Sequence, residues 1–427
     1  MRVASAAAPP TSGRRAGVAV AAAVMAAFFL FTGTGCNTYQ TKAVVTRDSI
    51  RGGTASQAAA KLEPLANKES DDQLIYLLDY ATTLQIAGRY KESADAFNRA
   101  ERIADVQDYH SLSRVTSAAL LSEQMIQYKG DDYEKVMIHA INASNYLEMG
   151  DLDGALVEVR KLNIKLHKYK TEAKRDYEQN PFAFYISAII WEADRKYDDA
   201  YIAYKNAYDV NPSYPPLRED LIRSAIKAQR DDELAKWKKE FPEVQIKPEW
   251  KDKNMGEIVL VYQQGWGPRK QPRPENFRFP YLVPSFSETQ QAKLVVDGVN
   301  DTTTSRVFSV QQVAIKTLND DYGRLIASRL GGVAAKAVMA DQIRQKNELL
   351  GAVAWIAMNV ADQADLRQWS TLPETLQIAR MPVKPGKYKV KAVGLNGAGY
   401  QTSEAMQERE VEVKPGRKAF INWRSVR

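Results

Sequence analysis

The spacing of apolar residues divides the chain into a helical half and a strand-rich half. From about Glu69 to Lys239, apolar positions recur every three or four residues, which is the period of an amphipathic helix. Past Pro242 the apolar runs become short and β-branched, with turn signals between them. A loop is expected at 265–279 and helices at 311–361. We expect strands at 257–263, 281–286, 292–297, 305–310, 375–381, 387–394, 408–414 and 418–423. The predicted fold class is therefore α+β: helical repeats followed by a mixed β-rich domain with an inserted helical hairpin.

Three segments of the helical half match one another in register, at residues 77–100, 139–162 and 184–207. Each has a small residue where two helices can cross closely, then a bulky residue, and then a turn. The pattern resembles the tetratricopeptide repeat, a hairpin of two helices. The turns are 62 and 45 residues apart, whereas the repeat has a period of about 34 residues. We therefore expect an irregular stack, closed by one polar capping helix at 216–239.

The resemblance implies a groove on the inner face of the repeats, where a partner peptide or helix would bind. The groove positions lack the Lys/Asn/Arg set with which that repeat family clamps a peptide carboxylate, so apolar and hydrogen-bonding contacts are expected. The candidate partner-binding residues are Leu78, Gln85, Ser144, Asn145, Tyr185 and Glu192.

Several polar residues of the second repeat fit two interpretations. Asn142, Asn145, Glu158 and Arg160 could form an internal hydrogen-bond network or a ligand-facing cluster. His139 occupies a packing position of the repeat, which favours a place in the core over a role as a metal ligand.

The first residues predict export and lipidation. Residues 1–35 combine three arginines, a sixteen-residue apolar stretch and a run of small residues, as in a secretory signal. The run ends at Cys36 and resembles a bacterial lipobox, although Gly33 stands where leucine is usual. The resemblance implies lipidation of Cys36, and Asn37, by not being aspartate, favours the outer membrane. An ordinary signal peptide or an uncleaved anchor are the alternatives.

Composition restricts the chemistry. The net charge of +7 falls to +4 when the signal is removed, and no stretch resembles a nucleic-acid-binding module. One cysteine and three histidines leave little for a disulfide, a metal site or acid–base catalysis, so no catalytic residue, cofactor or metal is expected. A hydrolase using carboxylate pairs such as Asp131-Asp132 or Asp320-Asp321 stays a third, less favoured alternative.

Two features of the second half stand out. Arg367 and Trp369 lie two residues apart in an extended segment and would point the same way. They fit either a structural corner or a recognition motif for a glycan or peptide. Residues 323–361 are rich in Ala and Gly, and we expect a tightly packed helix pair, with membrane contact or self-association as the alternative.

The order of motifs resembles one family along nearly the whole chain. The lipobox, GRYKESADAFNRA, NYLEMGDLDGALVEVRK, FYISAIIWEADRKYDDAYIAYKNA and ADQADLRQWSTLP are similar to uncharacterised bacterial lipoproteins with tetratricopeptide repeats. We expect a signal peptide at 1–35, a tether with an early helix at 36–65, a helical domain at 66–242 and a mixed α/β domain with a β-sandwich-like tail at 250–427.

The function that follows is a lipid-anchored, periplasmic, non-catalytic scaffold that binds an envelope protein in the repeat groove. The alternative is a module that binds peptidoglycan or another glycan through its C-terminal domain. Its candidate stacking surfaces are Trp266, Tyr281, Trp369 and Trp423.

Overall fold

The computed structural model describes residues 39–111, 127–168, 180–319 and 364–427, with residues 171, 322, 338 and 341–345. The chain divides into two compact units, Met1–Val44 and Val45–Arg427. The predicted signal peptide, Cys36 and most of the Ala/Gly-rich stretch lie outside the described residues. None of the helices among those residues is long and apolar enough to cross a membrane.

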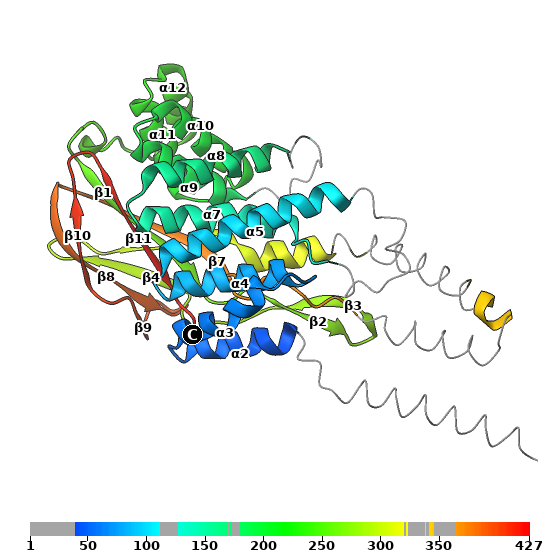
Figure 1. The fold of residues 1–427 in the computed structure, drawn as a ribbon. Helices are drawn as coiled ribbons and strands as arrows, with labels where there is room; N and C mark the ends of the chain where they lie inside the picture. Colours follow the sequence, from blue (N-terminus) through cyan, green and yellow to red (C-terminus); the bar gives the residue numbers. More distant parts are fainter. Residues whose placement is uncertain are drawn as a thin grey trace, which may run out of the picture. The chain divides into compact units, whose positions relative to one another are not determined.

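The helical half is a series of antiparallel hairpins, and the predicted fold class is confirmed (Figure 1). The three predicted repeats form the hairpins α4–α5, α7–α8 and α9–α10, and each pair packs together. A fourth hairpin, α11–α12, replaces the single capping helix expected at 216–239. The helices are α2 (Tyr39–Arg51), α3 (Ala55–Asn67), α4 (Gln73–Ile86), α5 (Tyr90–Ser111), α7 (Asp132–Glu148), α8 (Leu152–Lys168), α9 (Pro181–Ala193), α10 (Tyr197–Val210), α11 (Pro216–Lys227) and α12 (Asp231–Glu240).

The four hairpins share one turn geometry. The second residue after the first helix of each has a left-handed backbone: Gly88 (φ 76°), Gly150 (71°), Arg195 (62°) and Gln229 (54°). In each turn the next N–H donates to the carbonyl five residues earlier, at 2.8–2.9 Å, as from Arg230 to Ala225. This is the Schellman arrangement that ends many helices. The two non-glycine turns explain why the sequence pattern was weaker in the later hairpins.

The stretch predicted as a tether with an early helix contains two helices, α2 and α3. In α3, Ala58, Ala59, Leu62 and Ala66 are buried, and the helix packs against α4. Small side chains are common in linkers, but they also allow two helices to pack closely, as α3 and α4 do here.

The second half is a β-sandwich. One sheet has the strand order β11-β1-β7-β6, and the other has β10-β8-β4-β5 with β9 beside β8. Among the strands that the structure describes, only β1 and β11 pair in parallel. The strands are β1 (Gly256–Gln264), β4 (Gln291–Val296), β5 (Thr302–Thr303), β6 (Ser305–Ser309), β7 (Thr375–Val383), β8 (Gly386–Leu395), β9 (Gln401–Ala405), β10 (Arg409–Val413) and β11 (Lys418–Arg424).

A further hairpin, β2 (Arg269–Arg273) and β3 (Asn276–Val283), occupies most of the stretch expected to be a loop. Pro272 faces Pro280 across it, and the register shifts after Pro272. Prolines cannot donate to a ladder and are tolerated at such irregularities, so the proline-rich composition concealed β2 and the start of β3, whose end overlaps the strand predicted at 281–286.

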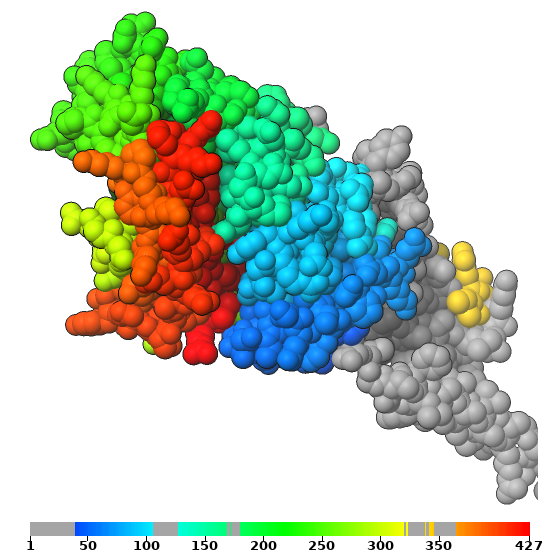
Figure 2. All heavy atoms as spheres, turned by 60° about the vertical axis from the view of Figure 1, so that its left-hand side comes forward, coloured from blue at the N-terminus to red at the C-terminus, as the bar shows by residue number. Residues whose placement is uncertain are grey.

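The first sheet is covered on both faces. Its inner face, which includes Ile258, Leu260 and Met381, packs on Leu294 and Val390 of the other sheet in one buried core. Its outer face consists of the alternate residues of β1, β7 and β11, and these contact the helical half. In Figure 2 the orange-to-red C-terminal strands lie directly against the blue-to-green helices, and α7 packs against β11. The two halves therefore share an extensive interface.

Candidate functional site

The inner face of the helical repeats is occupied by the chain's own second half. All six predicted partner-binding residues are buried. Gln85 accepts a hydrogen bond from Gln263 of β1 at 2.7 Å, and Glu192 pairs with Arg380 of β7 and Lys418 of β11. The prediction that these residues offer a free groove is wrong, because the outer face of the first sheet fills it.

The other groove candidates are used inside the helical half. Asn145 donates to Ser93 at 2.9 Å and accepts from Gln85 at 2.7 Å, and Ser144 donates to the carbonyl of its own helix. Tyr185 donates to Asp220, while Leu78 packs in the core. Asn142 also joins the network, through Asn98. The structural interpretation of the polar residues in the second repeat is therefore confirmed for the two asparagines.

The RQWSTLP segment inserts between the helices and the sheet. The Arg367 guanidinium pairs with Asp365 and with Asp72, the residue that precedes α4, and lies over the Tyr128 ring. The indole of Trp369 is buried, packs on Phe97 and donates to Thr82 at 2.9 Å. The structure thus uses this motif as an internal anchor, and Trp369 is not accessible as an external recognition residue.

A single carboxylate of α4 holds the middle of this segment. Asp79 accepts the backbone N–H and the hydroxyl of Thr371 on Oδ1, both at 2.9 Å, and the hydroxyl of Ser370 on Oδ2, also at 2.9 Å. Asp79 lies one residue beyond Leu78 on the helix that was expected to face a peptide. The groove therefore binds an extended peptide, and that peptide belongs to the same chain.

Glu134 at the start of α7 binds the same segment. Its side chain accepts the N–H of Trp369 at 2.8 Å and also accepts from Tyr128 and from the N–H of Asp131. Burial and the neighbouring Asp131 raise the pKa of Glu134, while Lys270, Tyr128 and Trp369 lower it, and the net pKa is about 7.

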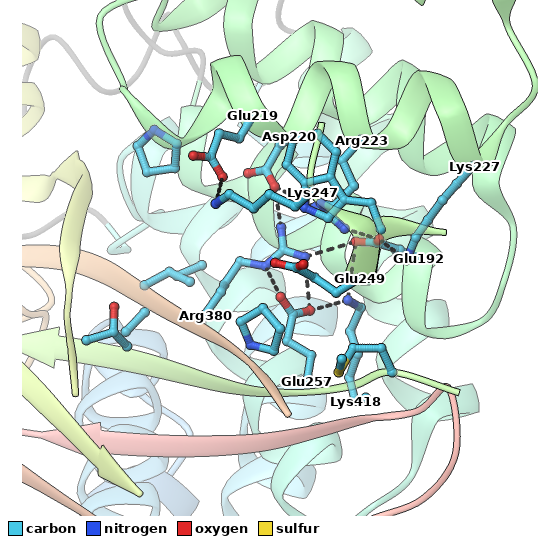
Figure 3. A pocket seen from close by; sticks show the side chains of 18 of the residues that line it. Glu192, Glu219, Asp220, Arg223, Lys227, Lys247, Glu249, Glu257, Arg380 and Lys418 are labelled. Carbon is cyan, nitrogen blue, oxygen red and sulfur yellow. Dashed lines mark hydrogen bonds and ion pairs between the residues drawn. The ribbon is translucent and has the colours of Figure 1, made fainter. Parts of the chain in front are cut away.

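A second polar contact between the halves centres on Arg380 of β7 (Figure 3). All five of its N–H groups are used. They reach both oxygens of Glu257 at 2.8 and 2.9 Å, Asp220 at 2.7 Å, Tyr204 at 2.9 Å and Glu192 at 3.1 Å. Strands β1 and β7 and helices α9, α10 and α11 are thereby joined through one side chain.

Three further cations complete this charge cluster, which we define as Glu192, Asp220, Arg223, Lys227, Glu257, Arg380 and Lys418. Arg223 binds Glu192 and Asp220, Lys418 binds Glu192 and Glu257, and Lys227 binds Glu192 at 3.0 Å. The cluster lines a pocket of about 460 Å³ between α9, α11 and the sheet. Thr303, Trp250 and Lys247 lie at other parts of its wall.

The electrostatics of the cluster keep Glu192 and Glu257 ionised. Burial raises the pKa of Glu192 and of Glu257, but the surrounding arginines and lysines outweigh it and hold both well below the usual range. Burial lowers the pKa of Lys418, as do Arg380 and Arg223, against the opposite effect of the two glutamates. Because each group is bound to an opposite charge, the arrangement suits rigid attachment of the halves better than proton transfer.

His139 belongs to the one group among the described residues that could hold a metal ion, with Glu101 and Glu158. Its Nδ1 lies 2.8 Å from Glu158 and its Nε2 lies 3.9 Å from Glu101. The Lys161 ammonium lies 2.7 Å from Glu101 and 3.2 Å from Glu158, so a cation of the protein already bridges both carboxylates. His139 is buried, as predicted for a packing position.

Of the four aromatic residues considered for glycan stacking, two are buried, and the other two, Tyr281 and Trp423, are partly exposed. Trp266 and Trp369 are buried, and Trp423 stacks on Tyr262 with 5.0 Å between ring centres. Trp266 also donates from its indole to the carbonyl of Val426. Trp266 and Trp369 pack against the helical half and Trp423 packs within the sandwich, which weighs against the glycan-binding alternative.

Sequence reasoning missed Asp79, Glu134 and Arg380. A signal for them existed in the strand at 257–263, which is apolar at consecutive positions rather than at alternate ones. Such runs are typical of strands buried on both faces. The run therefore indicated that a second layer covers the sheet, although it did not identify that layer as the helical groove.

No known sequence family matches the chain, and no curated protein does. Solved structures similar to under half of it include MamA from Desulfovibrio magneticus RS-1, 14% identical over 48% of this chain and 91% of that chain, with a TM-score of 0.32. A tetratricopeptide repeat protein from Parabacteroides merdae is 16% identical over 48% of this chain and 67% of that one, with a TM-score of 0.32. TPR-like repeats of a putative kinesin light chain from Podosopora anserina are 12% identical over 48% and 93%, with a TM-score of 0.33.

Proposed function

We propose that the protein is a non-catalytic protein-interaction scaffold of the bacterial cell envelope, attached to a membrane by a lipid on Cys36. The proposal places the body in the periplasm and favours the outer membrane. The lipobox-like sequence around Cys36 supports the anchor. Several acyl chains would attach the protein stably, whereas one chain binds a membrane only marginally.

The scaffold proposal rests on one observation: the repeat groove is occupied by a segment of the same chain. Asp79 and Glu134 hold the extended segment around Thr371 through its backbone and side chains, which is how a groove would hold a peptide ligand. With the groove occupied and the charge cluster joining the halves, residues 45–427 form one compact platform. A partner would then bind to the outer surfaces of the platform.

The pocket at the charge cluster supports a non-catalytic role. Glu192 and Glu257 are paired with Arg380 and Lys418, and their lowered pKa values make them poor general acids near neutral pH. The cations Arg223, Arg380 and Lys418 are likewise engaged by carboxylates, which leaves them poorly suited to binding a reacting anion.

The anchor is tested by fractionating cells that express the chain or its Cys36→Ser variant. We expect the chain in the membrane fraction and the variant in the soluble periplasmic fraction. If the Cys36→Ser variant associates with the membrane as the unchanged chain does, the lipid anchor is overturned. The scaffold proposal is tested separately.

The scaffold is tested by photo-crosslinking in living cells from exposed positions of the helices, Lys91, Asp231 and Lys238, with Lys387 and Glu412 on the sandwich as matched positions. We expect a discrete product with one envelope protein from at least one helical position. Products with peptidoglycan alone, or no discrete product from any position, would overturn the proposal.

A further inference from the structure

A groove on the side of the helical half away from the sandwich interface is flanked by exposed apolar side chains. Its walls are Leu166 on α8 and Ile202 on α10, and its floor is formed by Phe184 and Trp191 of α9. The groove has a volume of about 330 Å³. Its remaining lining residues are Asn163, His167, Asp199, Ala203 and Asn206.

An apolar ridge runs along α8 beside this groove. Val157 and Ile164 are seven residues apart on the helix and so lie on the same face, and they are 45% and 71% exposed. Ile202, on the opposite wall, is 46% exposed. A ridge next to a groove of helical width is the arrangement by which helices pack together.

The two walls carry opposite charges. The last turn of α8 has Lys165, His167 and Lys168, and the first turn of α10 has Asp198 and Asp199. Among the described residues, no ion pair engages Lys168 or Asp199, and both side chains are exposed. The groove therefore has a basic edge and an acidic edge.

The direction of the helices determines how these charges can meet a second copy. Asn180, which immediately precedes α9, donates to the Met137 sulfur in the first half of α7, so α7 and α9 run in the same direction. Because α8 and α10 return antiparallel to α7 and α9, they also run in the same direction along the groove. When the α8 ridge of a second copy enters the groove antiparallel, its Lys168 end faces the Asp199 end of the first copy. The same contact repeats under two-fold symmetry, as an isologous interface requires.

We propose that this ridge and groove form a self-association surface, through which two copies of the chain make a two-fold dimer. Ile164 of each copy enters the groove of the other between Leu166 and Ile202. Lys168 of each copy pairs with Asp199 of the other. This dimer would leave the solvent-facing side of the sandwich and the ends of the helical stack free. The dimer proposal is therefore independent of which envelope protein is the partner.

Sedimentation velocity of the full chain in a neutrally buoyant detergent tests the dimer over a broad concentration range. We expect a monomer–dimer equilibrium. Ile164→Asp should raise the dissociation constant by about tenfold or more, since it places a charge in an apolar contact. The matched control is Phe286→Asp, because Phe286 is 92% exposed on the sandwich half, and it should leave the equilibrium unchanged.

The charged edges provide a second test. Asp199→Lys should weaken the dimer, and combining it with Lys168→Asp should restore it, because the pair is re-formed with its charges exchanged. A chain that is monomeric at all concentrations, or that dimerises equally with Ile164→Asp, would overturn the proposal. So would a monomer in which position 164 crosslinks in cells only to an unlike protein, a result that would still support the scaffold function.

Discussion

Nη2 of Arg380 on strand β7 lies 3.1 Å from Oε2 of Glu192 on helix α9, across the boundary between the two halves of the protein. The same guanidinium binds Asp220 and Glu257. Removing the arginine would leave these negative charges buried with fewer positive partners. We therefore expect Arg380→Leu to lower the free energy of unfolding by about 3–5 kcal/mol, as measured by urea denaturation.

Arg417→Leu is the control for this substitution. Arg417 lines the same pocket but is exposed, so its loss should change the free energy of unfolding by no more than about 0.5 kcal/mol. Similar effects of the two substitutions would show that the buried pairs of Arg380 do not hold the halves together.

The charge cluster also predicts how stability responds to acid. The folded-state pKa values of Glu192 and Glu257 lie below the usual 4.5. Their contribution to stability is therefore present above pH 4.5 and is lost as the pH falls through the folded-state values. We expect the unfolding free energy of the natural chain to fall more steeply below pH 4.5 than that of Glu257→Gln. Parallel curves for the two proteins would contradict this expectation.

The helix hairpins were predictable because their signals are local. A small residue such as Ala81, a bulky one and a turn at Gly88 all lie within one segment of the sequence, and helix packing uses them directly. The fourth hairpin was missed because Gln229 adopts the left-handed turn in place of glycine. Hence the sequence indicated the type of repeat more clearly than the number of repeats.

The contents of the groove could not be predicted from local signals. Glu192 and Arg380 are 188 positions apart, and Asp79 and Thr371 are 292 apart. Nothing near Glu192 in the sequence distinguishes a carboxylate that binds an external peptide from one that binds a distant strand. The sequence predicted apolar and hydrogen-bonding contacts in the groove, but whether its occupant lay inside or outside the chain depended on tertiary structure.

The attachment of the RQWSTLP segment can be tested at Asp79. Asp79→Ala would leave the N–H and hydroxyl of Thr371 and the hydroxyl of Ser370 without their acceptor in a buried site. We expect a loss of about 2–4 kcal/mol in the free energy of unfolding, since each unsatisfied buried group is costly. Both variants are compared by thermal or urea denaturation. Asp95→Ala, at an exposed position of α5, should leave the free energy of unfolding nearly unchanged. A neutral Asp79→Ala would argue against this anchor.

Glu134 should give a pH dependence of the opposite sign. Its pKa is raised to about 7, so the folded state holds the proton more tightly than the unfolded state. The resulting stabilisation is complete below the usual pKa of 4.5 and is lost as the pH rises through about 7.

Infrared difference spectroscopy can follow this ionisation directly. We expect the carbonyl band of a protonated carboxylic acid to disappear as the pH rises through about 7, and we expect this change to be absent in Glu134→Gln. Full ionisation of Glu134 already near pH 5, about the range of an ordinary carboxyl, would show that the hydrogen bonds to Trp369 and Tyr128 outweigh its burial.

The left-handed turns predict one stabilising substitution. Gln229 has φ 54° at the turn of the fourth hairpin, where the first two hairpins have glycine. An L-residue with a side chain is strained in this conformation and glycine is not, so Gln229→Gly should raise the free energy of unfolding by about 0.5–1 kcal/mol. Gly150→Gln should lower it by about 1–2 kcal/mol. Lys238→Gly, inside α12, separates turn geometry from a general effect of glycine, because it should be destabilising by about 1 kcal/mol in the same thermal unfolding assay. Equal losses from Gln229→Gly and Lys238→Gly would contradict the role assigned to the turn.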